Sequence, residues 1–250
     1  MSPARFEKIL GLNFFIGTAD EAIDQISTTG GLVVVPAGPA LVTLPTNAAY
    51  RQALLAADLI ISDSAFMVLL WNLTHLHWIS KLSGLKYLRA LLLQPDFRKP
   101  GATCWVMPSA VSAERNRQWL EQQGIVLTDD NLYVAPIYTN TPQDPALLAL
   151  LERTRPRHII IGLGGGIQEP LGYHLKQNLS YKPCIHGVGA AIGFLTGDQV
   201  HIPVWVDALG MGWLWRILSN PRRFIPRYWA ARKLATLILR YGSELPAFKN

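Results

Sequence analysis

The stretch that most constrains the fold runs from Ile159 to Gly172 and reads IIIGLGGGIQEPLG. It opens with three isoleucines, and an apolar run without polar alternation is typical of a strand buried on both faces of a parallel sheet. Glycines follow at once, and glycine permits tight turns and the close approach of a ligand. We expect a strand, a glycine-rich turn and then a helix starting near Gln168 and Glu169, where helix N–H groups favour an anion.

This glycine turn does not fit the dinucleotide-binding pattern. The spacing set by Gly162 and Gly164 would require a third glycine at the position of Ile167, and no acidic residue stands about twenty residues further on to bind a ribose. A strand that ends in glycines and opens a helix is still where α/β proteins usually bind a ligand. The alternative is a tight turn that binds nothing.

Strands and helices alternate along the chain, which predicts βαβ units. Thr18 is the expected N-cap of the first helix. We predict an α/β fold with a Rossmann-like, mainly parallel sheet and helices on both faces. The expected strands are Phe6–Phe15, Leu32–Val35, Asp58–Ile61, Thr103–Met107, Leu132–Ala135, Ile159–Ile161 and one within Pro183–Ala191.

Composition limits the class of protein. The chain has 250 residues, enough for a sizeable core, and half are hydrophobic, yet no run of about 18 apolar residues exists to span a bilayer. The N-terminus does not resemble a secretory signal. Cys104 and Cys184 have neither metal-binding nor disulfide-framework spacing, so we expect a reducing, cytoplasmic setting.

The segment after Pro203 differs from the rest. It holds eight Lys and Arg residues but only two acidic residues, which accounts for the whole net charge of +6. Aromatic residues are interleaved with the arginines, as in a membrane-surface element or an arm that closes over a phosphate. Core helices with a basic solvated face are the alternative. We predict a core over residues 1–203 and a helical, basic, aromatic-rich appendage over residues 204–250.

Asp63 follows the strand predicted at Asp58–Ile61. In open α/β sheets ligands bind outside the carboxyl ends of the strands, so Asp63 is a candidate general base. The alternative is that Asp63 only caps the helix that follows.

Taken together, these motifs resemble the WecG/TagA/CpsF glycosyltransferases. Each is weak alone, but their order and spacing over most of the chain are specific. The matching pieces are Ala57–Leu59 with Ser62-Asp63, Lys81-x-x-Gly84, Ile161–Gly164 with Gln168-Glu169, Gly187–Gly189 with Gly197, Pro203-x-Trp205, Gly212–Arg216, Asn220–Arg223 and Arg227-Tyr228.

The resemblance implies an inverting, metal-independent enzyme without a cofactor, in which Asp63 deprotonates the acceptor hydroxyl. The donor would be a UDP-linked, N-acetylmannosamine-like sugar, and the acceptor a polyprenyl-diphosphate-linked sugar used for surface polysaccharide or wall polymer. The enzyme would lie at the inner face of the cell membrane, touching it through the appendage, and would bind no nucleic acid. The implied nucleotide-sugar-binding residues are Lys81, Tyr138, Gly164, Gly165, Gly166, Gln168, Glu169, Arg216, Arg222, Arg223 and Arg227.

The chain departs from the family pattern at four places. A Thr-x-Asn expected after the strand ending at Val35 is replaced by Pro36-Ala37-Gly38, which offers no side-chain donor. Ser64 replaces a glycine, Lys81 an arginine and Gly166 a proline, and lysine lacks the bidentate geometry of arginine. The alternative function is therefore a catalytically inactive module that binds a nucleotide-sugar or a membrane.

Overall fold

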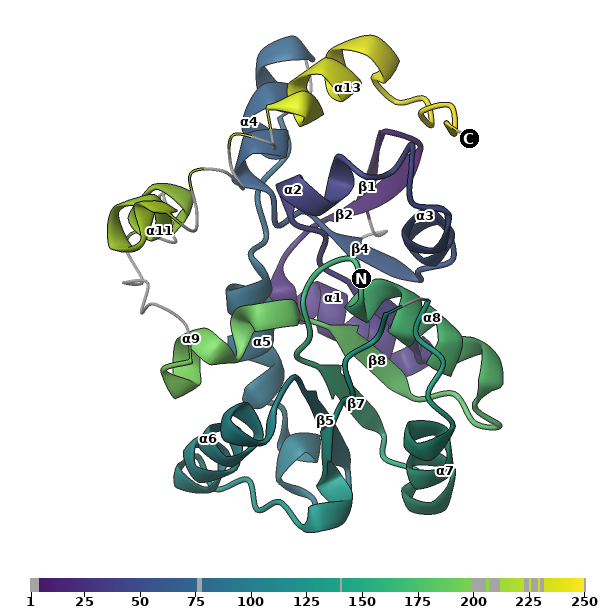
Figure 1. The fold of residues 1–250 in the computed structure, drawn as a ribbon, viewed down its shortest axis with the longest axis vertical. Helices are drawn as coiled ribbons and strands as arrows, with labels where there is room; N and C mark the ends of the chain where they lie inside the picture. Colours follow the sequence, from purple (N-terminus) through teal and green to yellow (C-terminus); the bar gives the residue numbers. More distant parts are fainter. Residues whose placement is uncertain are drawn as a thin grey trace.

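Eight strands form one sheet in the order β1-β2-β4-β3-β8-β7-β5-β6 (Figure 1). This computed structural model describes residues 5–75, 78–139, 141–198, 206, 212–222, 225, 229 and 232–249. Every neighbouring pair of strands is parallel except β1 and β2. The predicted α/β fold with a mainly parallel sheet is confirmed. The strands are β1 Arg5–Ile9, β2 Leu12–Ile16, β3 Gly31–Val34, β4 Leu59–Ile61, β5 Thr103–Met107, β6 Leu132–Val134, β7 His158–Ile161 and β8 Cys184–Gly187.

Helices connect the strands, as the alternation in the sequence predicts. Thr18 caps the first of them through a capping box, because its hydroxyl accepts from the N–H of Glu21 while its own N–H donates to the Glu21 carboxylate. The α-helices are α1 Ala19–Thr29, α2 Gly38–Leu41, α3 Ala48–Leu55, α4 Ala65–Thr74, α5 Gly84–Leu92, α6 Ala110–Gln122, α7 Pro145–Thr154, α8 Gln168–Asn178, α9 Gly193–Thr196, α11 Gly212–Ser219 and α13 Lys233–Tyr241. Three short 3-10 helices are η1 Pro95–Arg98, η2 Asp129–Asn131 and η3 Gly189–Ala191.

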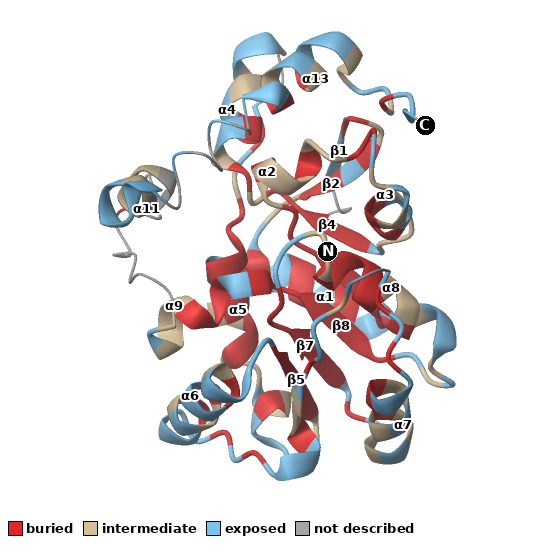
Figure 2. Ribbon diagram, viewed as in Figure 1, coloured by how far each residue is buried: buried red, intermediate tan, exposed pale blue. Residues whose placement is uncertain are grey.

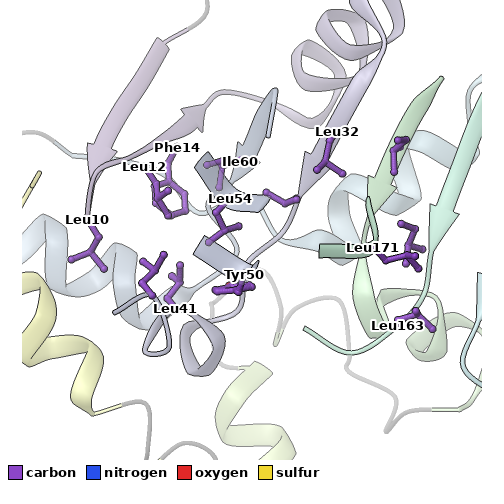
Figure 3. Packing of buried hydrophobic residues seen from close by; sticks show 14 of the residues in the cluster. Leu10, Leu12, Phe14, Leu32, Leu41, Tyr50, Leu54, Ile60, Leu163 and Leu171 are labelled. Carbon is purple, nitrogen blue, oxygen red and sulfur yellow. The ribbon is translucent and has the colours of Figure 1, made fainter. Parts of the chain in front are cut away.

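The inner strands β3, β4, β5, β7 and β8 are buried on both faces. Alternate residues of β7 divide between two hydrophobic clusters, since Ile159 and Ile161 join one and Ile160 joins the other. The first cluster includes side chains of α2, α3, α4, α7, α8 and α13, and the second includes side chains of α1, α5 and α6. Figure 2 shows the resulting band of buried residues along the sheet, and in the first cluster Leu54 of α3 points toward Ile60 of β4 (Figure 3).

The single strand predicted over Phe6–Phe15 is wrong, because this stretch is a β-hairpin. Leu10 and Gly11 form its turn with φ values of 52° and 76°, and two successive positive φ values match the twist of a two-residue hairpin loop. The N–H groups of both turn residues donate to the backbone oxygens of Gly242 and Ser243 at 2.9 Å. A distant part of the chain thus holds the turn, and β1 makes the sheet mixed.

Part of the segment assigned to the appendage packs against the sheet domain. Leu234 and Ile238 of α13 are buried in the same cluster as Met67 and Val68 of α4, and the two helices lie together at one end of the molecule (Figure 1). The division at residue 203 stays a prediction. Of the helices that the structure describes, none has the length and apolar character needed to cross a membrane.

Candidate functional site

Asp63 lies at the carboxyl end of β4, where the sequence places the general base. Its Oδ1 accepts a hydrogen bond of 2.9 Å from the N–H of Gly84, the first residue of α5. The cap of the helix that follows Asp63 is Ser64, whose hydroxyl accepts from the N–H of Met67. The alternative role of Asp63 as the N-cap of α4 is therefore wrong, and its half-buried carboxylate joins two segments at the edge of the sheet.

The segment before α5 is hydrogen-bonded to the end of β4 through the residues on either side of Lys81. The Ser62 hydroxyl donates to the backbone oxygen of Ser80 at 3.0 Å, and the N–H of Leu82 donates to the backbone oxygen of Ser62 at 3.2 Å. Lys81 stands between these two bonded residues and is half-buried. The structure therefore brings the backbone of Lys81 close to the end of β4, and the contact of Lys81 with a nucleotide-sugar stays a prediction.

The loop after β3 lies between Asp63 and the glycine turn. A methyl group added to Gly84 would lie 2.9 Å from Cγ1 of Val35, and one added to Gly165 would lie 3.7 Å from Cβ of Ala40. Loops following β4, β3 and β7 thus meet at one edge of the sheet. Such an edge, outside the carboxyl ends of parallel strands, is where open α/β sheets bind ligands.

The glycine turn is shaped by a buried carboxylate. Gly166 has φ of 91° and its N–H donates to Oε2 of Glu169 at 2.7 Å. Glu169 is fully buried, and this burial raises its pKa, while the N–H donors act in the opposite direction. The side chain that the sequence assigns to ligand binding therefore positions the loop, and the accessible groups of the turn are those of Gly164 and Gly165.

Gln168 joins the turn after β7 to the turn after β8. Its Oε1 accepts from the N–H of Gly189 at 2.6 Å, and its Nε2 donates to Oε1 of Glu169 at 3.3 Å. Only 2% of Gln168 is exposed. Gln168 thus stands at the predicted edge of the sheet, where it holds two glycine turns in a fixed relation.

Tyr138 lies on a different loop from these residues, and its contact with a nucleotide-sugar stays a prediction. It lies in the loop that follows the edge strand β6, and four strands separate β6 from β4 in the sheet. Its hydroxyl donates to Oδ2 of Asp144 at 2.7 Å, and Asp144 in turn caps α7. Burial and this carboxylate raise the pKa of the Tyr138 hydroxyl. The hydroxyl of Tyr138 thus makes a local hydrogen bond, while its ring packs against the first hydrophobic cluster.

The four predicted arginines are described only in part. Arg216 belongs to α11, which stands off from the sheet in Figure 1. Arg222 is exposed shortly after that helix. Arg223 and Arg227 lie outside the described residues. Their contribution to the site stays a prediction.

A buried polar chain beneath the site was not predicted from the sequence. The Tyr87 hydroxyl of α5 lies 2.9 Å from Nδ1 of His186, and Nε2 of His186 lies 3.1 Å from Nδ1 of His158. Burial lowers the pKa of both imidazoles, to about 4 for His158. Cys184 also borders the pair. These three side chains tie α5 to β8 and β7 at the centre of the sheet. The N–H of Gly84, which donates to Asp63, belongs to the same helix.

Comparison with known proteins identifies the family. The sequence pattern of the glycosyl transferase WecG/TagA/CpsF family matches residues 7–246, nearly the whole chain. The chain belongs to this family. The WecG/TagA/CpsF match spans Asp63, the glycine turn and α13 alike, so the residues brought together at the sheet edge all lie within the family's shared region.

A more specific relative comes from Bacillus subtilis (strain 168). It is the N-acetylglucosaminyldiphosphoundecaprenol N-acetyl-beta-D-mannosaminyltransferase, 24% identical over 190 residues that cover 72% of this chain and 70% of that protein. The name of that relative states both the sugar it transfers and its lipid-linked acceptor. This chain is a glycosyltransferase of the same family.

Proposed function

We propose that this glycosyltransferase moves an N-acetylmannosamine-like sugar from a UDP donor to a polyprenyl-diphosphate-linked sugar, with inversion and without a metal. The observation that carries the proposal is the position of Asp63, half-buried at the carboxyl edge of the sheet and held by the first N–H of α5. The relative from Bacillus subtilis supports the substrate class through the name it bears.

The proposed chemistry is a single displacement. Asp63 takes the proton from the acceptor hydroxyl as the acceptor oxygen bonds to the anomeric carbon of the donor. The bond between that carbon and the phosphate oxygen breaks, and UDP leaves with the electron pair. Because the hydrogen bond to Gly84 fixes Oδ1, we assign the proton to Oδ2.

The donor would lie along the glycine turn. Gly164 has open space where a side chain would stand, so its backbone is accessible to a ligand. The negative charge on the leaving UDP would be neutralised by Lys81 and by the arginines 216, 222, 223 and 227 of the C-terminal segment. We propose that this segment also touches the inner face of the cell membrane.

The test is glycosyl transfer by the purified protein across a panel of UDP-sugars, with EDTA present, to a short-chain polyprenyl-diphosphate acceptor. We expect transfer from one N-acetylhexosamine donor, with an inverted product by NMR. Transfer that requires added magnesium would contradict the metal-independent mechanism, and absence of transfer from every donor would contradict the function.

One observation favours the inactive binding module instead. The residues Pro36, Ala37 and Gly38, between β3 and the start of α2, stand where the family pattern expects Thr-x-Asn, so this segment brings no polar side chain to the sheet edge. That module would bind UDP, as measured by calorimetry, but would neither transfer nor hydrolyse any donor. Measurable turnover of a single UDP-sugar would exclude it.

A further inference from the structure

Helix α4 carries apolar side chains on the side that faces solvent. Phe66 is 41% exposed, Leu69 58% and Leu73 73%. The spacings of three and four residues put these side chains in one stripe along the helix. The opposite side of α4 is buried in the core through Met67, Val68 and Trp71. The helix is therefore apolar toward both the core and the solvent.

The stripe lies in a stretch without charge. Residues 64–80 contain no Asp, Glu, Lys or Arg, and Trp78, shortly after the helix, is 82% exposed. Surface helices of globular proteins normally carry polar and charged residues on the solvent side. The exposed side of α6, for example, has Glu114 and Arg115. The outer side of α4 is thus suited to a partner that removes it from water.

The helix that packs against α4 carries positive charge on its exposed side. α13 packs against α4 through its buried side. Its solvent side holds Lys233, Arg240 and Leu239, which is 67% exposed, and its N-cap residue Arg232 is exposed as well. No acidic residue occurs in α13. Figure 2 shows exposed surface on both helices at the same end of the molecule. Apolar side chains beside basic ones match an anionic lipid surface, which binds both.

The stripe is also close to Asp63. Ser64 separates Asp63 from the first residue of α4, and ten helical residues extend about 15 Å. A protein that acts on a lipid-linked sugar needs its base within a short distance of the bilayer. We propose that α4 and α13 together form a bilayer-contacting surface, with the α4 stripe inserted at the headgroup boundary of an anionic membrane; the link to Asp63 rests on the proposed function.

The decisive experiment compares two double variants of the full chain in co-sedimentation with vesicles. One carries Leu69→Asp and Leu73→Asp in the stripe. The control carries Leu93→Asp and Val126→Asp, at positions 73% and 74% exposed that lie outside the stripe. Vesicles of equal parts phosphatidylglycerol and phosphatidylethanolamine are compared with phosphatidylcholine alone. We expect the stripe variant to lose about tenfold in partitioning to the anionic vesicles, and the control to match wild type.

Changing Arg232, Lys233 and Arg240 to Gln should remove the preference for phosphatidylglycerol over phosphatidylcholine. Circular dichroism checks folding, and Leu69→Ser with Leu73→Ser replaces the aspartate pair if that pair unfolds. Wild-type vesicle binding by the stripe variant would overturn the inference. A second result would also overturn it: a wild type that is dimeric in sedimentation velocity and a stripe variant that is monomeric but still binds vesicles. The stripe would then contact a second copy of the chain rather than a membrane.

Transfer to a water-soluble acceptor separates this inference from the proposed function. We expect the stripe variant to keep that transfer while losing vesicle binding. A wild-type protein that binds vesicles through the stripe but transfers no sugar would refute the proposed function and leave the lipid-binding surface in place.

Discussion

Oδ1 of Asp63 lies 2.9 Å from the backbone nitrogen of Gly84, so the start of α5 holds the carboxylate proposed as the base. Asp63→Asn retains an oxygen for this hydrogen bond but cannot take a proton. We expect a loss of about a hundred- to ten-thousand-fold in turnover, with unchanged UDP affinity by calorimetry. Undiminished turnover in this variant would contradict the assignment of Asp63 as the general base.

The close approach at Gly84 gives a second prediction. Gly84 does not need positive φ, so Gly84→Ala acts through space alone, because the new methyl group would stand 2.9 Å from Cγ1 of Val35. We expect about 1 to 3 kcal/mol lower stability in urea unfolding and a reduced kcat as α5 shifts from Asp63. Adding Val35→Ala should restore both; a double variant no better than Gly84→Ala would show that the contact is not the cause.

We expect Gln168 to contribute to stability and to UDP binding because it joins two glycine turns. Gln168→Leu has a similar size but leaves the N–H of Gly189 without its 2.6 Å acceptor. We expect a loss of about 1 to 3 kcal/mol in unfolding free energy and weaker UDP binding. Gln118→Leu, at an exposed position on α6, is the matched control and should change neither. Equal UDP affinity in wild type and Gln168→Leu would contradict the positioning role.

The buried histidine pair predicts a pH dependence of stability. Burial lowers the pKa of His158 to about 4 from 6.5, with Arg157 adding to the shift and Asp96 opposing it. Between these values the unfolded chain binds more protons than the folded one, so stability falls as pH falls. We expect His158 to account for about 2 kcal/mol of stability lost between about pH 7 and pH 5.

Urea unfolding of wild type and His158→Gln at both pH values measures this contribution. The raised pKa of Glu169 acts in the opposite direction but is common to both proteins, so it cancels in the comparison. The variant should show a flatter dependence. An equally steep decline in His158→Gln would exclude the imidazole as its source.

Much of the fold could be predicted from local sequence, because buried strands of a parallel sheet are continuous apolar runs, as at Ile159–Ile161. The hairpin could not. Its turn is Leu10-Gly11 rather than the usual Asn-Gly or Asp-Gly, and its backbone bonds come from residues 242 and 243. Such support depends on tertiary structure, which no short window of sequence contains.

The parts of the site that directly follow a strand could be predicted from the sequence. The contacts between side chains distant in sequence could not. Asp63 and the glycine turn follow strands, so their place at the carboxyl edge comes from topology alone. The burial of Glu169 and the pairing of His158 with His186 depend on which helix covers each face. Sequence reasoning therefore missed the contact of Glu169 with its own loop, and its contact with a ligand stays a prediction.

The bond between the Leu10-Gly11 turn and residues 242–243 has a consequence for how the protein is made. On the ribosome the hairpin emerges before its partners, and its turn cannot complete its hydrogen bonds until more than two hundred further residues have been added. A methyl group on Gly11 would stand 2.5 Å from Cβ of Leu245, so the fit is close when the two segments meet. We therefore expect the turn, unlike the local pairing of β1 with β2, to be fixed late in folding, since contacts so distant in sequence form slowly.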